Sequence, residues 1–337
     1  MFDVAISQLT TARWELPQEL AQIAEHGFAA VSLWRPKLSD VGIRTAATQL
    51  AGHGLRVSSL QWAGGFTGSD GRSYNESVAD AVEAIEAAAR LAAACPRADR
   101  PPVLLVLSGC RGGHTRSHAG RLLAQALDVL APVARREGVV LALKPFHPLA
   151  APGCSFMTDI GEALDLVERF GDDTIRLAVD LWHFAQTAGL AGLLPRLAAV
   201  AGVVQVADRC GPPSSDADRQ PAGYGGLDLE SLVASLWEHG YRGDFEFDPV
   251  GETVEMLGYS GVLQETRRVA DAWAERLSGR EAVAGHRFEG SCLQARGVAA
   301  GISHAPAEDR LRDHLRRSAG AAGSRRSQAS SHSVSRG

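Results

Sequence analysis

The sequence predicts an α/β fold: a (β/α)8 TIM barrel forming a single domain over residues 1–278, followed by a tail over residues 279–337. Short apolar runs alternate with longer helical patterns throughout the first of these segments, which implies parallel strands joined by right-handed crossovers. No G-x-G-x-x-G motif follows the first run, and this argues against an open, doubly wound sheet. The tail is rich in arginine, serine, glycine and alanine, so we expect it to be mostly disordered.

The predicted strands are short runs of apolar and β-branched residues. They cover residues 2–8, 29–35, 55–63, 102–109, 139–146, 175–183, 202–208 and 243–249. Eight strand–helix units are the number that closes a barrel of this class.

The predicted helices between these strands are amphipathic, and several begin at a carboxylate and end at glycine. Asp159 is expected to cap the helix over residues 159–171 at its start, and Gly171 to end it. The remaining clear patterns cover residues 75–94, 118–138 and 227–240.

Charge is distributed unevenly along the chain. The tail has ten arginines and five acidic residues, and because the whole chain has a formal net charge of −5, residues 1–278 carry −10. A domain this acidic is a poor binder of polyanions, so we expect no nucleic-acid partner.

Apolar runs and cysteine spacing bear on the compartment. No run approaches the roughly 20 apolar residues that a membrane span needs, and the N-terminus resembles a first strand more than a signal peptide. The five cysteines include no C-x-x-C pair, which indicates neither a disulfide framework nor a thiolate zinc site. We therefore expect a cytoplasmic protein without a membrane partner.

Polar residues gather at the predicted ends of the last four strands, where the side chains of a barrel meet in one bowl. One of them, Lys144 in LALKPFHP (residues 141–148), is among only two lysines in a chain with 34 basic residues. The polar residues at these four ends are Lys144, His147, Asp180, His183, Gln205, Asp208, Glu246 and Asp248.

These strand ends resemble the xylose-isomerase-like TIM barrels, a superfamily that includes sugar phosphate isomerases and epimerases. The resemblance covers residues 1–278 and is most specific in LALKPFHP, AVDLWH, VQVADR and GYRGDFEFD. In that family a Glu, an Asp, a His and a Glu from strands five to eight hold one divalent cation, Mn²⁺, Mg²⁺ or Zn²⁺. The four ligand positions fall here on Lys144, Asp180, Gln205 and Asp248.

The residues at these positions change the charge that a metal would meet. The family's ligands sum to three negative charges, whereas the four residues here sum to one, and Lys144 places a cation at the metal's position. At about 4 Å two unit charges interact by roughly 4 kcal/mol at an effective dielectric of 20. Asp180, Asp248 and Gln205 would be the metal ligands if a cation binds, but the sequence predicts instead that the Lys144 ammonium replaces it and neutralises both acids.

The resemblance implies proton transfer next to the carbonyl of a small sugar, ketose or polyol. Lys144 would then be the electrophile, Asp180 its counter-ion, and Asp248 or Glu246 the base. The expected substrate contacts are His147, His183, Gln205 and Arg219. Arg219 lies in DRQPAGYGGLDL, which is similar to an arginine-bearing loop of the family.

Two alternatives remain open at this stage. The chain could be a non-catalytic, sugar-binding pseudoenzyme that has lost the family's metal site. Lys144 could also form a Schiff base with a carbonyl substrate, although flanking acids oppose the deprotonation that this requires. The sequence does not name the sugar, and a homo-oligomer is possible by analogy with the family.

Overall fold

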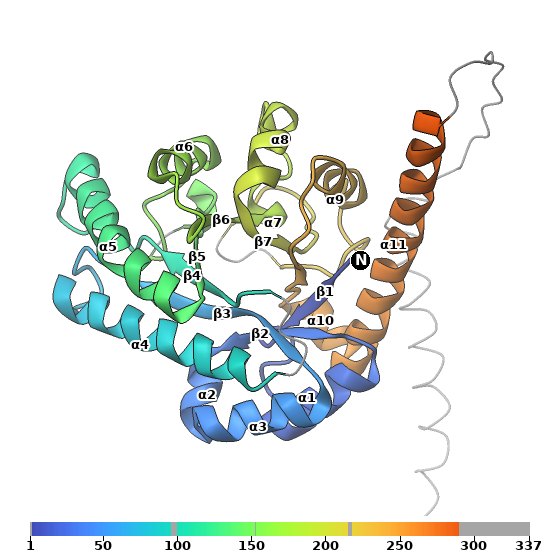
Figure 1. The fold of residues 1–337 in the computed structure, drawn as a ribbon, viewed down its shortest axis with the longest axis horizontal. Helices are drawn as coiled ribbons and strands as arrows, with labels where there is room; N and C mark the ends of the chain where they lie inside the picture. The colour runs from blue at the N-terminus through green and yellow to red at the C-terminus, as the bar shows by residue number, and fades with distance from the viewer. Residues whose placement is uncertain (1, 96–99, 152, 215–217, 290–337) are drawn as a thin grey trace, which may run out of the picture.

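The computed structural model describes residues 2–95, 100–151, 153–214 and 218–289, which form a closed barrel of parallel strands surrounded by helices (Figure 1). The barrel order follows the chain from the first strand to the eighth, and the eighth pairs with the first through Ala5 and Glu246. The predicted fold class and all eight predicted strands are therefore confirmed. The strands are β1 (Val4–Ser7), β2 (Ala30–Trp34), β3 (Arg56–Gly64), β4 (Val103–Leu107), β5 (Val140–Leu143), β6 (Ile175–Asp180), β7 (Ala201–Val206) and β8 (Phe245–Phe247).

Helices pack around the outside of the barrel and bury their apolar faces against it. Asp159 caps α6 by accepting a hydrogen bond from Glu162 N at 2.9 Å, and Gly171 ends that helix with φ of 58°, as predicted. The helices are α1 (Leu16–Glu25), α2 (Arg35–Val41), α3 (Ile43–His53), α4 (Tyr74–Ala93), α5 (Arg116–Glu137), the 3-10 turn η1 (Pro148–Ala150), α6 (Ile160–Phe170), α7 (Leu181–Phe184), α8 (Leu190–Val200), α9 (Leu229–Glu238), α10 (Glu252–Leu257) and α11 (Tyr259–Glu289).

Most strands are shorter than predicted, and two of the boundary differences have a clear structural origin. β6 ends at Asp180 rather than at residue 183, because the Asp180 carboxylate accepts from Trp182 N at 3.0 Å and so starts the helical turn α7. α11 continues beyond residue 278 to Glu289, so the predicted tail begins within this helix. The rest of the tail, residues 290–337, lies outside the described residues.

The interior of the barrel is polar toward the carboxyl ends of its strands. Ser7, Ser32, Ser59, Gln61 and Glu246 point into it and are buried. These side chains hydrogen-bond to one another, as buried polar groups must. This polar layer supports the site described below.

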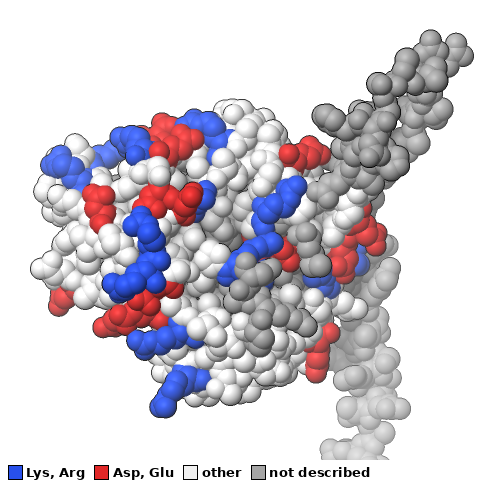
Figure 2. Space-filling view, in the orientation of Figure 1, with Lys and Arg blue, Asp and Glu red and all other residues white. Residues whose placement is uncertain are grey.

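Charges on the surface are mixed in sign. Figure 2 shows basic and acidic side chains interleaved over the face that α5 and α6 form. Arg116 pairs there with Glu162. Nearby, Arg196 of α8 pairs with Asp165 and Glu168 of α6. None of the helices within the described ranges is long and apolar enough to cross a membrane.

Candidate functional site

Three polar residues form a row across the last three strands of the barrel. Strand register pairs Asp180 with Gln205 and Gln205 with Glu246. All three side chains face the barrel interior, and each residue is 0% exposed. The row therefore brings an amide between two carboxylates in a region that water does not reach.

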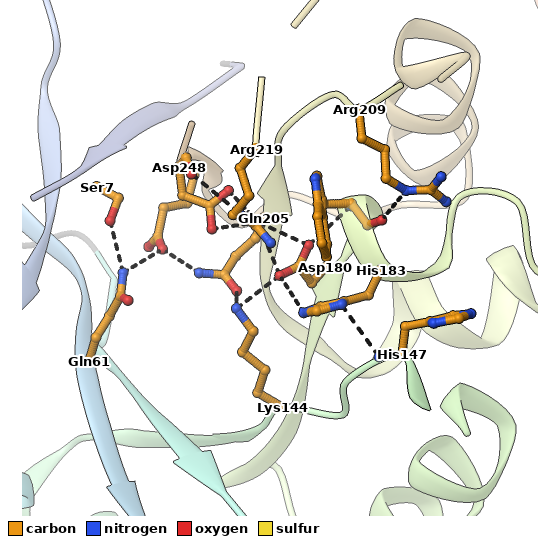
Figure 3. Close-up of polar contacts among 12 residues, drawn as sticks. Ser7, Gln61, Lys144, His147, Asp180, His183, Gln205, Arg209, Arg219 and Asp248 are labelled. Atoms are coloured by element: carbon orange, nitrogen blue, oxygen red, sulfur yellow. Dashed lines mark hydrogen bonds and ion pairs between the residues drawn. The ribbon is translucent and has the colours of Figure 1, made fainter. Parts of the chain in front are cut away.

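Lys144 follows β5 and reaches this row from the side (Figure 3). Its backbone N–H donates to Val106 O at 2.9 Å, which fixes the start of the side chain at the strand end. The Lys144 ammonium lies 2.9 Å from Asp180 Oδ2 and also donates to Gln205 Oε1. The Lys144 side chain is 10% exposed, while that of Asp180 is 0% exposed.

Arg219 holds both acids at once. Its Nη2 donates to the two carboxylate oxygens of Asp248, each at 2.6 Å, and to those of Asp180 at 3.1 and 3.2 Å. The sequence predicted that Lys144 would neutralise both acids and that Arg219 would contact substrate. In the structure Lys144 pairs with Asp180, and Arg219 is the cation that pairs with Asp248.

The segment that carries Arg219 is tied to three strand ends. Arg219 N donates to Val250 O at 2.9 Å beyond β8, and Asp208 N donates to Gln220 O at 2.7 Å beyond β7. The guanidinium also lies over the Trp182 ring beyond β6, 5.0 Å from its centroid. These long-range contacts place Arg219 between the acids, so the local motif that singled out Arg219 could not show that it pairs with Asp180 and Asp248.

Burial raises the pKa of both Asp180 and Asp248, but the neighbouring cations outweigh it only at Asp180. Burial alone would raise the pKa of Asp180, but Arg219 and Lys144 outweigh it and hold that pKa well below its usual range. Burial raises the pKa of Asp248 to about 6 against the opposing effect of Arg219, and repulsion from Asp180 adds to the rise. Asp180 therefore has the lowered pKa of the pair and Asp248 the raised one.

Of the two predicted histidines, only His183 joins the cluster. It is 3% exposed, and its Nε2 lies 3.7 Å from Asp180 Oδ2. Burial lowers the pKa of His183 to about 3 although Asp180 opposes this shift, so the ring is neutral. The His147 ring instead accepts from Leu149 N at 3.3 Å and lies away from Lys144 in Figure 3.

Glu246, predicted as an alternative base, is enclosed by hydrogen-bond donors. It accepts from Ser59 at 2.6 Å, Gln205 at 2.7 Å, Ser58 at 3.2 Å and Gln61 at 3.4 Å. Burial raises its pKa despite these donors. A carboxyl group in this position is better suited to hold its neighbours than to reach a ligand.

Of the four positions that the resemblance assigns to metal ligands, only Asp180 keeps the family's residue. A divalent cation needs several anionic or neutral donors converging on one point. Among the described residues, no group of three or more His, Cys, Asp or Glu side chains is arranged to hold a metal. Lys144 and Arg219 instead occupy the oxygens of Asp180 and Asp248, so the residues present do not fit the ion.

A closed barrel with its polar residues at the carboxyl ends of the strands is the architecture of TIM-barrel enzymes. Residues 20–255 match the model of the xylose isomerase-like TIM barrel family. The chain belongs to this family, whose relatives are sugar isomerases and epimerases.

Individual relatives are more distant. An inosose isomerase of Halalkalibacterium halodurans is 29% identical over 132 residues, which are 38% of this chain and 45% of that protein. The matched segment thus spans less than half of the curated relative. The IOLI protein with a bound zinc atom has a TM-score of 0.69 at 18% identity, covering 82% of this chain and 99% of its own. An L-ribulose 3-epimerase has a TM-score of 0.67 at 19% identity, covering 84% and 98%.

Proposed function

We propose that this protein binds a small sugar, ketose or polyol at the barrel mouth and isomerises or epimerises it by proton transfer next to a carbonyl. The observation that carries the proposal is the cluster of Lys144, Asp180, Arg219 and Asp248 at the ends of β5 to β8. It offers a fixed cation beside a carboxyl group whose pKa, about 6, suits a base near neutral pH. The names of the inosose isomerase and the L-ribulose 3-epimerase are consistent with such substrates.

Each residue has one task in the proposed reaction. Lys144 donates a hydrogen bond to the carbonyl oxygen and stabilises the negative charge that develops there. Asp248 takes the proton from the neighbouring carbon and leaves an enediolate whose oxygen Lys144 stabilises. For isomerisation Asp248 returns that proton to the former carbonyl carbon, while the neighbouring hydroxyl gives its proton to the former carbonyl oxygen. For epimerisation a water molecule delivers a proton to the opposite face of the same carbon, and Asp248 passes its proton to solvent. Asp180 holds Lys144 in place and keeps its ion pair with Arg219. The contact between Arg219 and Asp248 must break for the base to reach the carbon.

The direct test is hydrogen exchange into the substrate. Wild-type protein is incubated in D₂O with L-ribulose or an inosose, with EDTA and separately with Mn²⁺, and deuterium in the recovered sugar is measured by mass spectrometry. We expect exchange in EDTA, and its loss by about 10²- to 10⁴-fold in Asp248→Asn. Arg116→Gln, on the exposed surface of α5, is the matched control and keeps the wild-type rate. Exchange that requires Mn²⁺ would contradict the proposal.

One observation favours a second candidate, a sugar-binding protein without turnover. Arg219 covers the carboxylates of both Asp180 and Asp248 and leaves neither open to a ligand. Calorimetry with the same sugars separates the two functions. Binding heat without deuterium exchange would support the binding protein, whereas exchange would support the isomerase.

A further inference from the structure

Gln205 connects the Lys144 ammonium to the buried carboxylate of Glu246. Its Oε1 accepts from the Lys144 ammonium (Figure 3). Its Nε2 donates to Glu246 Oε1 at 2.7 Å. A side-chain amide has its acceptor and its donors on opposite sides. Whatever fixes the donor side of Gln205 therefore decides where its acceptor side faces.

Glu246 is itself held firmly. It is 0% exposed, and donors from the β3 strand meet both of its carboxylate oxygens. One of these donors, Gln61, is fixed in turn by Ser7 at 3.0 Å and Ser32 at 2.6 Å. Because every member is buried, the direction of the Glu246 carboxylate is set by four strands of the barrel.

Lys144 has a donor to spare at the end of this chain of hydrogen bonds. An ammonium carries three N–H groups. Within the described part of the chain, Lys144 meets two oxygen acceptors, Gln205 Oε1 and Asp180 Oδ2. The centroid of the Phe146 ring lies 5.2 Å from the ammonium, and the Lys144 side chain is 10% exposed rather than fully enclosed. An oxygen atom at the mouth would be a stronger acceptor for the third N–H than this ring.

We propose that Glu246 and Gln205 are positioning residues that orient the Lys144 ammonium so that its third N–H binds the oxygen of a ligand. Glu246 does not touch the ligand and acts through Gln205. The inference rests on the proposed function for the ligand, while the orientation of Lys144 is a property of the free protein. The two can therefore fail separately.

Substitutions at residue 246 distinguish this role from simple packing. Gln at 246 still offers an oxygen to Gln205 Nε2, so the amide keeps its direction. Met at 246 fills a similar volume without an acceptor, which frees Gln205 to turn its Oε1 away from Lys144. Gln205→Met removes the acceptor of Lys144 directly. If Glu246→Met does not fold, Gln205→Met tests the same loss of orientation of Lys144.

The readout uses the fact that the chain has only two lysines, Lys37 and Lys144. Full-length protein labelled with [ε-¹³C]lysine gives two lysine signals, and Lys37 serves as the internal reference because it lies in a separate cluster. We expect Glu246→Met and Gln205→Met to move the Lys144 signal and leave that of Lys37, whereas Glu246→Gln leaves both in place. An unmoved Lys144 signal in either folded Met variant, or an equal movement in Glu246→Gln, overturns the proposal.

Titration with L-ribulose tests the ligand step. The Lys144 signal of wild-type protein should shift on addition of the sugar, and the apparent Kd should rise about tenfold in Glu246→Met, as expected for loss of one charge-assisted hydrogen bond. In Glu246→Gln the rise should be less than about twofold. Movement of the free-protein signal as expected, without any response to L-ribulose, would uphold the orienting role and count against the proposed ligand.

Discussion

Lys37 and Lys144 are the only lysines of the chain, and their surroundings are alike at first sight. Each side chain is 10% exposed and lies within 3 Å of a buried carboxylate, Glu19 at 2.8 Å for Lys37 and Asp180 at 2.9 Å for Lys144. Each also has one neutral oxygen acceptor, since Lys37 donates to Thr11 O at 3.1 Å and Lys144 to Gln205 Oε1. A buried lysine with a carboxylate is therefore not by itself a sign of function.

The two clusters differ in how the charge is balanced and how the acceptor is fixed. Glu19 is completed by neutral donors from Gln8 and Thr11, whereas Asp180 also meets a second cation, Arg219. The neutral acceptor of Lys37 is a main-chain carbonyl, which cannot turn, while that of Lys144 is an amide that needs Glu246 to hold it. The Lys37 cluster ties α2 to α1 and to the segment after β1, whereas the Lys144 cluster lies at the barrel mouth.

The largest difference between the two clusters should appear when Lys144 and Arg219 are replaced by residues that can bind a metal. Lys144→Glu/Arg219→Gln leaves three carboxylates and Gln205 around one point, a set that suits a divalent ion. Replacing a repulsive charge at about 4 Å changes the interaction by roughly 4 kcal/mol or more, so Mn²⁺ should bind on the order of a thousandfold more tightly than to wild type.

Metal content after dialysis and calorimetry with Mn²⁺ measure this gain. Lys144→Glu alone should gain less, because Arg219 still occupies Asp180 and Asp248. Lys37→Glu, in the other cluster, should gain no ion. Stoichiometric metal in the purified wild-type protein would show that the two fixed cations do not exclude it.

Removing the shared carboxylate should give the next largest effect. Asp180→Asn leaves Lys144 and Arg219 buried with one acid between them, and we expect the free energy of unfolding to fall by about 3–5 kcal/mol. Glu19→Gln leaves a single cation among neutral groups and should cost less. Urea unfolding compares the two, and Glu162→Gln, at an exposed pair, should change stability by less than about 1 kcal/mol. Equal losses of unfolding free energy in Asp180→Asn and Glu19→Gln would contradict the proposed difference in charge balance between the two clusters.

The neutral histidine beside Asp180 should make stability depend on pH. His183 has a pKa of about 3 in the folded protein against 6.5 for the free side chain, so folding disfavours its protonated form. Its contribution is complete above pH 6.5 and is lost as the pH falls toward 3. Between pH 7 and pH 5 the loss should be about 2 kcal/mol.

His183→Asn should remove this part of the acid dependence, as measured by urea unfolding at pH 7 and pH 5. His53→Asn, at an exposed position, is the control and should keep the wild-type profile. Within the described residues the contacts of Lys37 and Glu19 include no histidine, so the effect belongs to the Lys144 cluster alone. An unchanged profile in His183→Asn would show that the ring takes up its proton without cost.

The smallest expected effect on stability tests whether the main-chain carbonyl of Thr11 holds Lys37 without help from a side chain. Thr11→Val removes the hydroxyl that donates to Glu19 but keeps the carbonyl that accepts from Lys37. Stability should fall by about 1 kcal/mol, and the Lys37 signal in the lysine spectrum should stay near its wild-type position. A large movement of that signal would mean that side chains, not the backbone, hold Lys37.

The fold was predictable because its signals are local. Each barrel strand needs only a short apolar run, and the caps at Asp159 and Gly171 act within one helical turn. The end of β6 was missed because Asp180 has two tasks, facing the barrel and capping α7. Sequence alone does not show which of these tasks ends a strand.

The sequence predicts which residues gather at the barrel mouth better than it predicts which of them pair with one another. Position along the strands brought Lys144, Asp180, Gln205 and Asp248 to one end of the barrel. The partner of Asp248 could not be predicted, since Arg219 reaches it from a segment fixed by pairing with Val250 and Asp208. The depth of Glu246 depends on its register with Gln205, and alternation along β8 does not reveal it.

The burial of both Lys37 and Lys144 also limits the chemical modification of amines on the protein surface. Every basic side chain other than these two is an arginine. Reagents that acylate primary amines would therefore find no lysine readily accessible on the surface. Apart from reaction at the N-terminal amine, acetylation or amine-directed cross-linking would report on the opening of one of these two interior ion pairs.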